Sequence, residues 1–380
     1  MGFLFVFFLG WLFLYADRTA LYPLLTVIGK EFSLSGVQIG SITSSFFVTY
    51  ALMQVPGGVL ADRWGYRKTL GATYALAGLA LAGIAVGGVT YGLLLTFVGL
   101  HGLGAGCFFP SSFGYILTRS APDRRAFNGA VVFTGLFVGL GFGLLMAGPL
   151  YSWLESWRLP FVLLAGPTLA LAAYYGFRMK EIPRKRSATK WSAVFFDRSV
   201  IAVMLANFCS LYGFWLAVSW GPAFLQSERN LSVTHSGVFT ALYAAAAIPA
   251  SLLAGRISDR LGRKRLCILL FPLAAAAILV MSFAHSRLWL ALSLIAFGAL
   301  GKPAVEPIML AWLGDRVARV KPEAMGSTMG MVNFIGQISG VIAPVLTGWI
   351  RDVTGSLAGG FYLGGAIVFA GFLLCLSARE

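Results

Sequence analysis

Twelve apolar stretches, each long enough to cross a lipid bilayer, occupy most of this 380-residue chain. A hydrocarbon core about 30 Å thick needs roughly 20 apolar residues in a helix. Helices suit this setting because they satisfy every backbone N–H and C=O internally. We therefore expect an all-α integral membrane protein with helices at residues 3–29, 36–61, 68–89, 91–118, 126–150, 157–178, 199–226, 233–256, 265–283, 286–314, 323–350 and 357–378.

The composition agrees with a membrane protein, since 58% of the residues are hydrophobic and only 11% are charged, against about 25% charged in soluble domains. The chain starts inside the first span, without a charged leader region or a cleavage site, so we predict no signal peptide and a trimmed or engineered start at Met1-Gly2. We expect small buried hydrophobes, with no disulfide framework, metal site or cofactor, at the isolated cysteines Cys107, Cys209, Cys267 and Cys375.

The second half of the chain repeats the first at one offset of 197 residues, without a gap. Matches in three separate regions indicate duplication of a six-helix unit, a plan typical of secondary transporters. We predict two pseudo-symmetric bundles, residues 1–178 and 199–380, joined by a basic linker at 179–198. The matching pairs are Gly58 with Gly255, Asp62 with Asp259, Arg63 with Arg260, Gly65 with Gly262, Gly104 with Gly301, Pro110 with Pro307, Gly129 with Gly326, Gly139 with Gly336 and Gly143 with Gly340.

The distribution of basic residues predicts the orientation. There are 29 Lys and Arg against 14 Asp and Glu. Counted by loop, 22 of the basic residues lie on one side of the predicted membrane and five on the other. Because basic loops stay in the cytoplasm, both termini and the linker should be cytoplasmic, beside anionic lipid headgroups. This excess needs no nucleic acid, and we expect a monomeric multi-pass protein of the bacterial inner membrane.

Two loops resemble a known family signature. Gly57-Gly58-Val59-Leu60-Ala61-Asp62-Arg63-Trp64-Gly65-Tyr66-Arg67-Lys68 resembles the loop between helices 2 and 3 of the major facilitator superfamily, and 255–264 is a weaker copy where that family repeats it. The resemblance covers the whole chain and implies the twelve-helix fold of that family. It also implies a conformational latch, for which the candidates are Gly58, Asp62, Arg63, Arg67, Asp259 and Arg260.

Two further segments are similar to the anion:cation symporter branch, which includes sialic-acid, hexuronate and galactonate transporters. They are Tyr15-Ala16-Asp17-Arg18 and the run Trp220-Gly221-Pro222-Ala223-Phe224-Leu225. The Asp-Arg pair also occurs in relatives that export sphingolipids. That branch commonly carries a proton-coupling glutamate in helix 4, five residues before a Phe-Pro proline. Here the proline is Pro110 and the matching position is Ala105, so a proton-coupled chain must use another carboxylate.

Four charged residues lie inside the predicted spans: Asp17, Arg18, Lys302 and Glu306. Each costs about 2.5–3.5 kcal/mol at the bilayer centre, so we expect a shared polar cavity near the midplane. Asp17 and Arg18 point about 100° apart, whereas Lys302 and Glu306 share a helix face. The alternative is a structural Lys302–Glu306 ion pair and a packing role for Asp17 and Arg18.

The functional interpretation gives each charge a role. The planar guanidinium of Arg18 suits a substrate carboxylate, with Lys302 as a second positive point. Asp17 and Glu306 would carry protons, because an anion that engages the cations changes proton affinity. His101, the only histidine inside a span, is a further candidate for proton coupling, or an interhelical hydrogen-bonding residue.

Softer candidates line or pack the helices. Tyr15 and Tyr22 should share the face of Arg18. Substrate-cavity lining or interhelical hydrogen bonding is expected for Asn207, Tyr212, Trp215, Asn333 and Gln337. Close helix packing is expected for the glycine stripes 135/139/143 and 336/340.

These observations favour a proton-coupled symporter that imports a small organic anion by alternating access. The alternative in the same fold is an exporter of amphipathic drugs or lipids, which the aromatic content of 14% would suit. A membrane enzyme or receptor is disfavoured, since the sequence has no nucleophile with a base and no His-Glu-x-x-His motif.

Overall fold

The computed structural model describes residues 2–121, 124–182, 197–321 and 324–378. Throughout these ranges the chain forms helices joined by short turns, with no strand. Among the described residues, 12 helical segments are long and apolar enough to cross a membrane. The all-α fold and the twelve predicted spans are therefore confirmed.

The chain divides into two compact units, and the first comprises Met1–Leu34, Ser41–Arg186 and Ser232–Val238. Most of this unit consists of the helices in the first half of the chain. The last of these helices continues into a wider, π-helical turn at Tyr174–Arg178. These helices are α1 (Gly2–Thr19), α2 (Leu25–Glu31), α3 (Gly36–Trp64), α4 (Tyr66–Gly87), α5 (Tyr91–Gly106), α6 (Phe108–Arg119), α7 (Arg125–Leu154) and α8 (Leu159–Ala173).

The second unit comprises Ser35–Gly40, Ser187–Leu231 and Phe239–Glu380. Most of the predicted linker, residues 183–196 with Pro183 to Arg186, lies outside the described residues, and the bundle limits at 178 and 199 stay predictions. The helices of the second half are α9 (Arg198–Arg229), α10 (Val233–Leu261), α11 (Arg263–Phe283), α12 (Arg287–Leu300), α13 (Lys302–Val320), α14 (Met325–Thr354) and α15 (Ala358–Ser377).

Three predicted spans are interrupted rather than continuous. The first breaks after Thr19, with a turn at Tyr22–Leu24 before α2; the fourth breaks at Cys107; the tenth breaks at Gly301. Prolines account for the last two, since Pro110 and Pro303 each lack the backbone N–H that would continue the helical hydrogen-bond ladder across the break. Broken helices allow polar backbone groups to face a solute.

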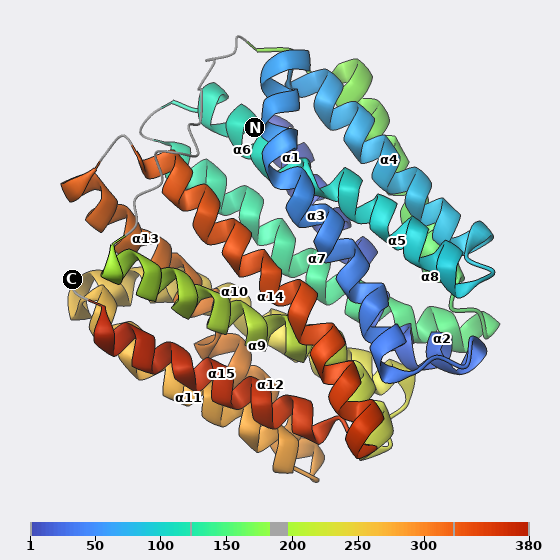
Figure 1. Ribbon diagram of the computed structural model, residues 1–380. Coiled ribbons are helices and arrows are strands. Elements are labelled where there is room, and N and C mark those ends of the chain that lie inside the picture. The colour runs from blue at the N-terminus through green and yellow to red at the C-terminus, as the bar shows by residue number, and fades with distance from the viewer. Residues whose placement is uncertain (1, 122–123, 183–196, 322–323, 379–380) are drawn as a thin grey trace. The chain divides into compact units, whose positions relative to one another are not determined.

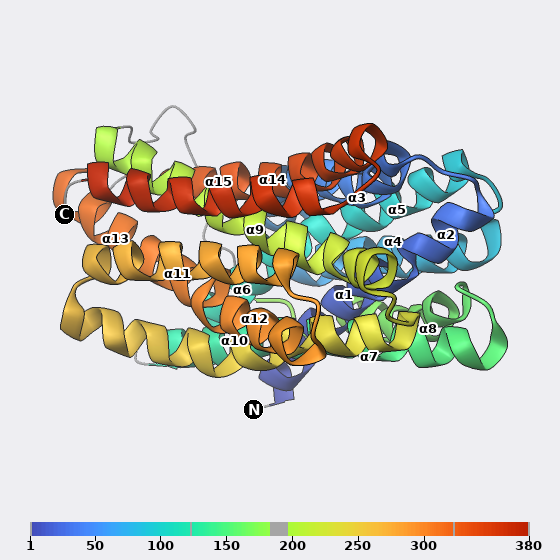
Figure 2. The same cartoon turned by 90° about the horizontal axis from the view of Figure 1, so that it is seen from below.

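A stripe of glycines holds α1 against α7, and the two helices run side by side in Figures 1 and 2. A methyl group added at Gly135, Gly139 or Gly143 would collide with backbone oxygens of α1, those of Phe8, Leu12 and Ala16. Small residues at such a seam let two backbones approach closely. The contact fixes the end of α1 that carries Asp17 and Arg18.

The repeated signature loops turn at equivalent glycines. Gly65 precedes α4 with φ 95°, and Gly262 precedes α11 with φ 88°. A side chain is strained in this region, which explains glycine at the same place in both halves. Of the latch candidates, Gly58, Asp62 and Arg63 lie in the last two turns of α3, Arg67 at the start of α4, and Asp259 and Arg260 in the last turn of α10. Arg63, Asp259 and Arg260 are exposed.

Equivalent residues of the two signature loops are held in place by different contacts. The carboxylate of Glu181 accepts the N–H of Tyr66 at 3.0 Å and that of Arg67 at 3.3 Å, at the start of α4. In the second unit, Lys264 donates from Nζ to the Ala378 carbonyl at 2.6 Å, after the last helix. The negative charge of Glu181 lies at the N-terminus of α4, and the positive charge of Lys264 lies at the C-terminus of α15. Each is opposite in sign to the partial charge of the helix dipole at that end and so stabilises the helix.

Candidate functional site

Asp17 lies in a buried polar cluster of the first unit. Its side chain is on α1, and its Oδ2 accepts a hydrogen bond from Thr168 Oγ1 of α8 at 2.9 Å. His101 of α5 places Nε2 4.0 Å from the same oxygen, and both Asp17 and His101 are at most 2% exposed. Three helices thus meet at one carboxylate. The sequence analysis missed Thr168, although a hydroxyl after Pro167 in an apolar run is a signal of this kind.

Arg18 lies among aromatic rings. Its guanidinium carbon is 3.7 Å from the centroid of the Tyr15 ring, 5.4 Å from that of Phe46 and 5.6 Å from that of Phe47. Such contacts stabilise a cation out of water, and the N–H groups in the guanidinium plane suit recognition of an anion. The sequence analysis named Tyr15 but missed Phe46 and Phe47. Tyr22 lines the same small cavity as Arg18.

In the second unit, Lys302 and Glu306 form an ion pair. Lys302 Nζ lies 2.9 Å from Glu306 Oε2, one turn further along α13. Lys302 is buried at 4% exposure, and its Nζ is 4.9 Å from the centroid of the Phe214 ring on α9. Since α13 begins at Lys302, the cation stands at the break in the tenth span.

The internal repeat shows that the two sites use equivalent positions. The 197-residue offset pairs Ala105 with Lys302 and Asp17 with Phe214. In the second unit, Lys302 lies over the ring of Phe214. In the first unit, the equivalent positions hold the small residue Ala105 and the carboxylate of Asp17. The place where the branch carries a glutamate therefore corresponds to a lysine in the other half. Duplication was followed by divergence of charge.

The remaining lining candidates pack inside the second unit. Asn207, Tyr212 and Trp215 are buried on α9. The Asn207 amide lies against Gly336 of α14, since a methyl group there would come within 3.0 Å of Nδ2. Gln337 donates from Nε2 to Asn333 Oδ1 at 3.4 Å along α14. Their predicted role as a substrate lining stays a prediction.

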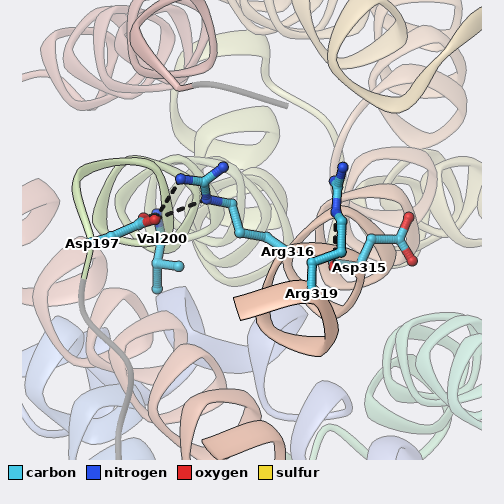
Figure 3. Close-up of polar contacts among 5 residues, drawn as sticks. All are labelled: Asp197, Val200, Asp315, Arg316 and Arg319. Carbon is cyan, nitrogen blue, oxygen red and sulfur yellow. Dashed lines mark hydrogen bonds and ion pairs between the residues drawn. The ribbon is translucent and has the colours of Figure 1, made fainter. Parts of the chain in front are cut away.

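A charged cluster joins α9, α11 and α13 of the second unit, and Figure 3 shows its part between Asp197 and Arg316. Asp197 Oδ2 accepts from Arg316 Nε at 2.8 Å and Nη2 at 2.6 Å, and its Oδ1 accepts from the Val200 N–H at 2.7 Å. The neighbouring Asp315 pairs with Arg263 at the start of α11. Burial alone would raise the pKa of Asp197, but the hydrogen bonds from Val200 and Arg316 outweigh it and lower that pKa. The sequence analysis counted Arg316 only as an orienting charge.

Within the described ranges, no three His, Cys, Asp or Glu side chains converge as metal ligands. All four cysteines are free and buried. The fold nevertheless brings two of them together, because the thiol of Cys267 on α11 lies next to that of Cys375 on α15. Chain spacing alone gave no sign of this contact.

The 12 helices of the described ranges that are long and apolar enough to cross a membrane, with charges buried beside helix breaks, indicate a multi-pass membrane protein. The sequence profile of the Major Facilitator Superfamily matches residues 7–344 and, a second time, 203–380. The chain belongs to the major facilitator superfamily, which gives it a transport role rather than an enzymatic one.

Curated relatives extend this comparison. The chain is 28% identical to the voltage-gated purine nucleotide uniporter of Mus musculus, over 93% of this chain and 84% of that one. It is 28% identical to the hexuronate transporter of Bacillus subtilis (strain 168), over 94% and 89%. The resemblance to the anion:cation symporter branch is therefore confirmed. The solved structure of a mutant of the nucleoside transporter NupG shares the fold, with a TM-score of 0.82 over 100% of both chains and 12% identity.

Proposed function

We propose that this transporter is a symporter that moves a small organic anion, a carboxylate or sugar acid, together with protons. The observation that carries the proposal is the Arg18 guanidinium, buried against Tyr15 beside the Asp17 carboxylate. A guanidinium held on aromatic faces is preorganised for a planar anion. The two relatives support an anionic substrate, since one is named for hexuronates and the other for purine nucleotides.

Coupling follows from the proximity of the charges. An anion bound by Arg18 reduces the positive charge beside Asp17 and so favours a proton on that carboxylate. Proton and anion then bind cooperatively, and the linkage is reciprocal. We assign the proton to Asp17, His101 or Glu306, with Lys302 as a second anchor for the anion. Rocker-switch alternating access and the latch role of residues such as Asp62 belong to the same proposal.

Two other activities are alternatives within the family. Export of an amphipathic drug or lipid would suit the aromatic content of 14%. However, the two buried cations, Arg18 and Lys302, favour an anion. Uniport without protons is the second alternative, because one relative is named a uniporter.

The test uses purified protein in proteoliposomes that contain a pH-sensitive dye. A hexuronate, a purine nucleotide and inorganic phosphate are supplied in turn under an imposed pH gradient. We expect one of these anions to accumulate together with protons. Anion movement without proton movement would establish uniport. Flux of an amphipathic cation, with none of any anion, would establish the exporter.

Two variants connect the flux to the site. Arg18→Lys keeps the charge but loses the planar fork, so we expect apparent anion affinity to fall about tenfold or more, close to the energy of one charged hydrogen bond. Retained affinity would contradict capture by the guanidinium. Glu306→Gln decides between the carboxylates: unchanged proton-driven accumulation would remove Glu306 from the coupling role.

A further inference from the structure

A small cavity lies inside the first unit, next to the buried carboxylate. Polar side chains on its wall include Asp17, Arg18, Thr43 and His101, and rings such as Phe46 and Phe161 complete it. The space open to the centre of a water molecule is about 10 Å³. That volume holds about one water and is far too small for an organic anion.

Three polar atoms on this wall lack a hydrogen-bond partner among the residues that the structure describes. They are Asp17 Oδ1, His101 Nε2 and Thr43 Oγ1, all fully buried. The 4.0 Å between His101 Nε2 and Asp17 Oδ2 exceeds hydrogen-bond range. Buried polar groups are almost always satisfied, and a polar gap of this width is commonly bridged by water. A single water here has the two to four partners that it needs.

We propose that one water in this cavity connects His101 to Asp17 and that His101 passes protons to and from Asp17 through it. The inference deepens the proposed function, because it names the route of the coupled proton at the same site. In the transfer, the Nε2–H bond of an imidazolium breaks, the water accepts that proton and releases one of its own to Asp17 Oδ1. Neutral imidazole, water and a carboxylic acid result.

The surroundings allow this relay to respond to substrate. Arg18 contributes a permanent positive charge to the same wall. The other titratable groups around Asp17 are tyrosines: Tyr15 beneath the guanidinium, Tyr22 on the cavity wall, and Tyr74 of α4, whose hydroxyl donates to the Gly10 carbonyl at 2.6 Å. From α3 and α8 the neutral hydroxyls of Thr43 and Thr168 face the site. An anion bound to Arg18 therefore changes the electrostatic potential at Asp17 and His101, and with it the proton affinity of these side chains.

The two side chains have different roles in this relay. His101 is here a positioning and relay residue, and Asp17 is the group that binds the proton.

The experiment titrates the full-length protein in lipid vesicles, without substrate, by infrared difference spectroscopy. The protonated-carboxyl band that disappears in Asp17→Asn is assigned to Asp17. In the proposed relay His101 and Asp17 share one water and titrate as a coupled pair, so that band should titrate in two steps in the wild type. In His101→Gln it should titrate in one step. His285→Gln, at an exposed loop histidine, is the matched control and should keep both steps.

A two-step curve that persists in His101→Gln, or a single step in the wild type, would overturn the relay. If His101→Gln and His101→Asn both fail to elute as folded protein, Thr43→Val decides, because it removes another partner of the same water. A changed separation of the two steps supports the relay, and an unchanged curve contradicts it. This titration contains no anion, so it tests the relay alone. The flux assay in proteoliposomes tests the proposed function, and failure of one is distinguishable from failure of the other.

Discussion

Asp197 performs two tasks with one carboxylate. One oxygen accepts the Val200 N–H and so caps α9, and the other accepts two bonds from Arg316 at the far end of α13 (Figure 3). The first is a helix-capping contact and the second is a charge-assisted pair. The ion pair with Arg316 holds only while the carboxylate is ionised, which makes its contribution dependent on pH.

The pair with Arg316 should therefore stabilise the fold at neutral pH and not in acid. The pKa of Asp197 is lowered on folding, because hydrogen bonds outweigh burial. Its stabilisation is fully present above the unfolded-state pKa, about 3.9, and is lost as pH falls through the lower folded-state pKa. We expect Asp197→Asn to lower the free energy of unfolding by about 1–3 kcal/mol at pH 7. Thermal unfolding in detergent at several pH values measures this.

Asparagine caps helices as well as aspartate does, so Asp197→Asn isolates the ion pair from the cap. Asp197→Ala removes both and should cost about 1 kcal/mol more. The curves of wild type and Asp197→Asn should converge in acid. A constant difference at every pH would show that the carboxylate charge is not what Arg316 recognises.

At the scale of helices, the repeat supplies a matched comparison between its own halves. Gly139 on α7 and Gly336 on α14 occupy the same repeat position. A methyl group at Gly139 would collide with the Leu12 backbone, whereas at Gly336 it would meet side-chain atoms of Asn207 and Leu211 at 3.0 and 3.2 Å. The Leu12 backbone cannot relieve this contact by a change of rotamer, whereas the side chains of Asn207 and Leu211 can.

Gly139→Ala should accordingly lower stability more than Gly336→Ala does. Overpacking of this kind costs about 1–3 kcal/mol, and the side-chain neighbours of Gly336 relieve part of it. Gly166→Ala, with nothing within 4 Å of the added methyl, is the control and should be neutral or slightly stabilising. Unfolding in mixed micelles gives the ranking. Equal losses at 139 and 336 would contradict the close α1–α7 seam.

The sequence predicted helices better than it predicted their interruptions. Apolar length identifies a span because insertion depends on composition along the chain. The break at Gly301 depends instead on one non-helical residue before Lys302-Pro303, which a hydropathy average does not register. Side-chain contacts between helices were harder to predict than the breaks, since Thr168, which donates a hydrogen bond to Asp17, lies 151 residues from it in the chain. The charges themselves were predictable because their cost in lipid demands a reason.

At the scale of the whole molecule, orientation is decided by loops and not by the site. The loop between α6 and α7 contains Arg124 beside Arg119 and Arg125 at the helix ends, whereas the loop between α11 and α12 is followed by Arg287 alone. Basic residues near the ends of spans keep their loops in the cytoplasm. The first loop should therefore be cytoplasmic and the second should face outward.

Single cysteines in these loops test that orientation in intact cells with a membrane-impermeant thiol reagent. All four native cysteines are buried, so the wild type should remain unlabelled and serves as the control. His285→Cys, at an exposed position before α12, should label from outside. Ala121→Cys, exposed after α6, should label only when the membrane is permeabilised. Because the spans alternate in direction, the reverse pattern would place both termini outside and contradict the charge rule for the whole chain.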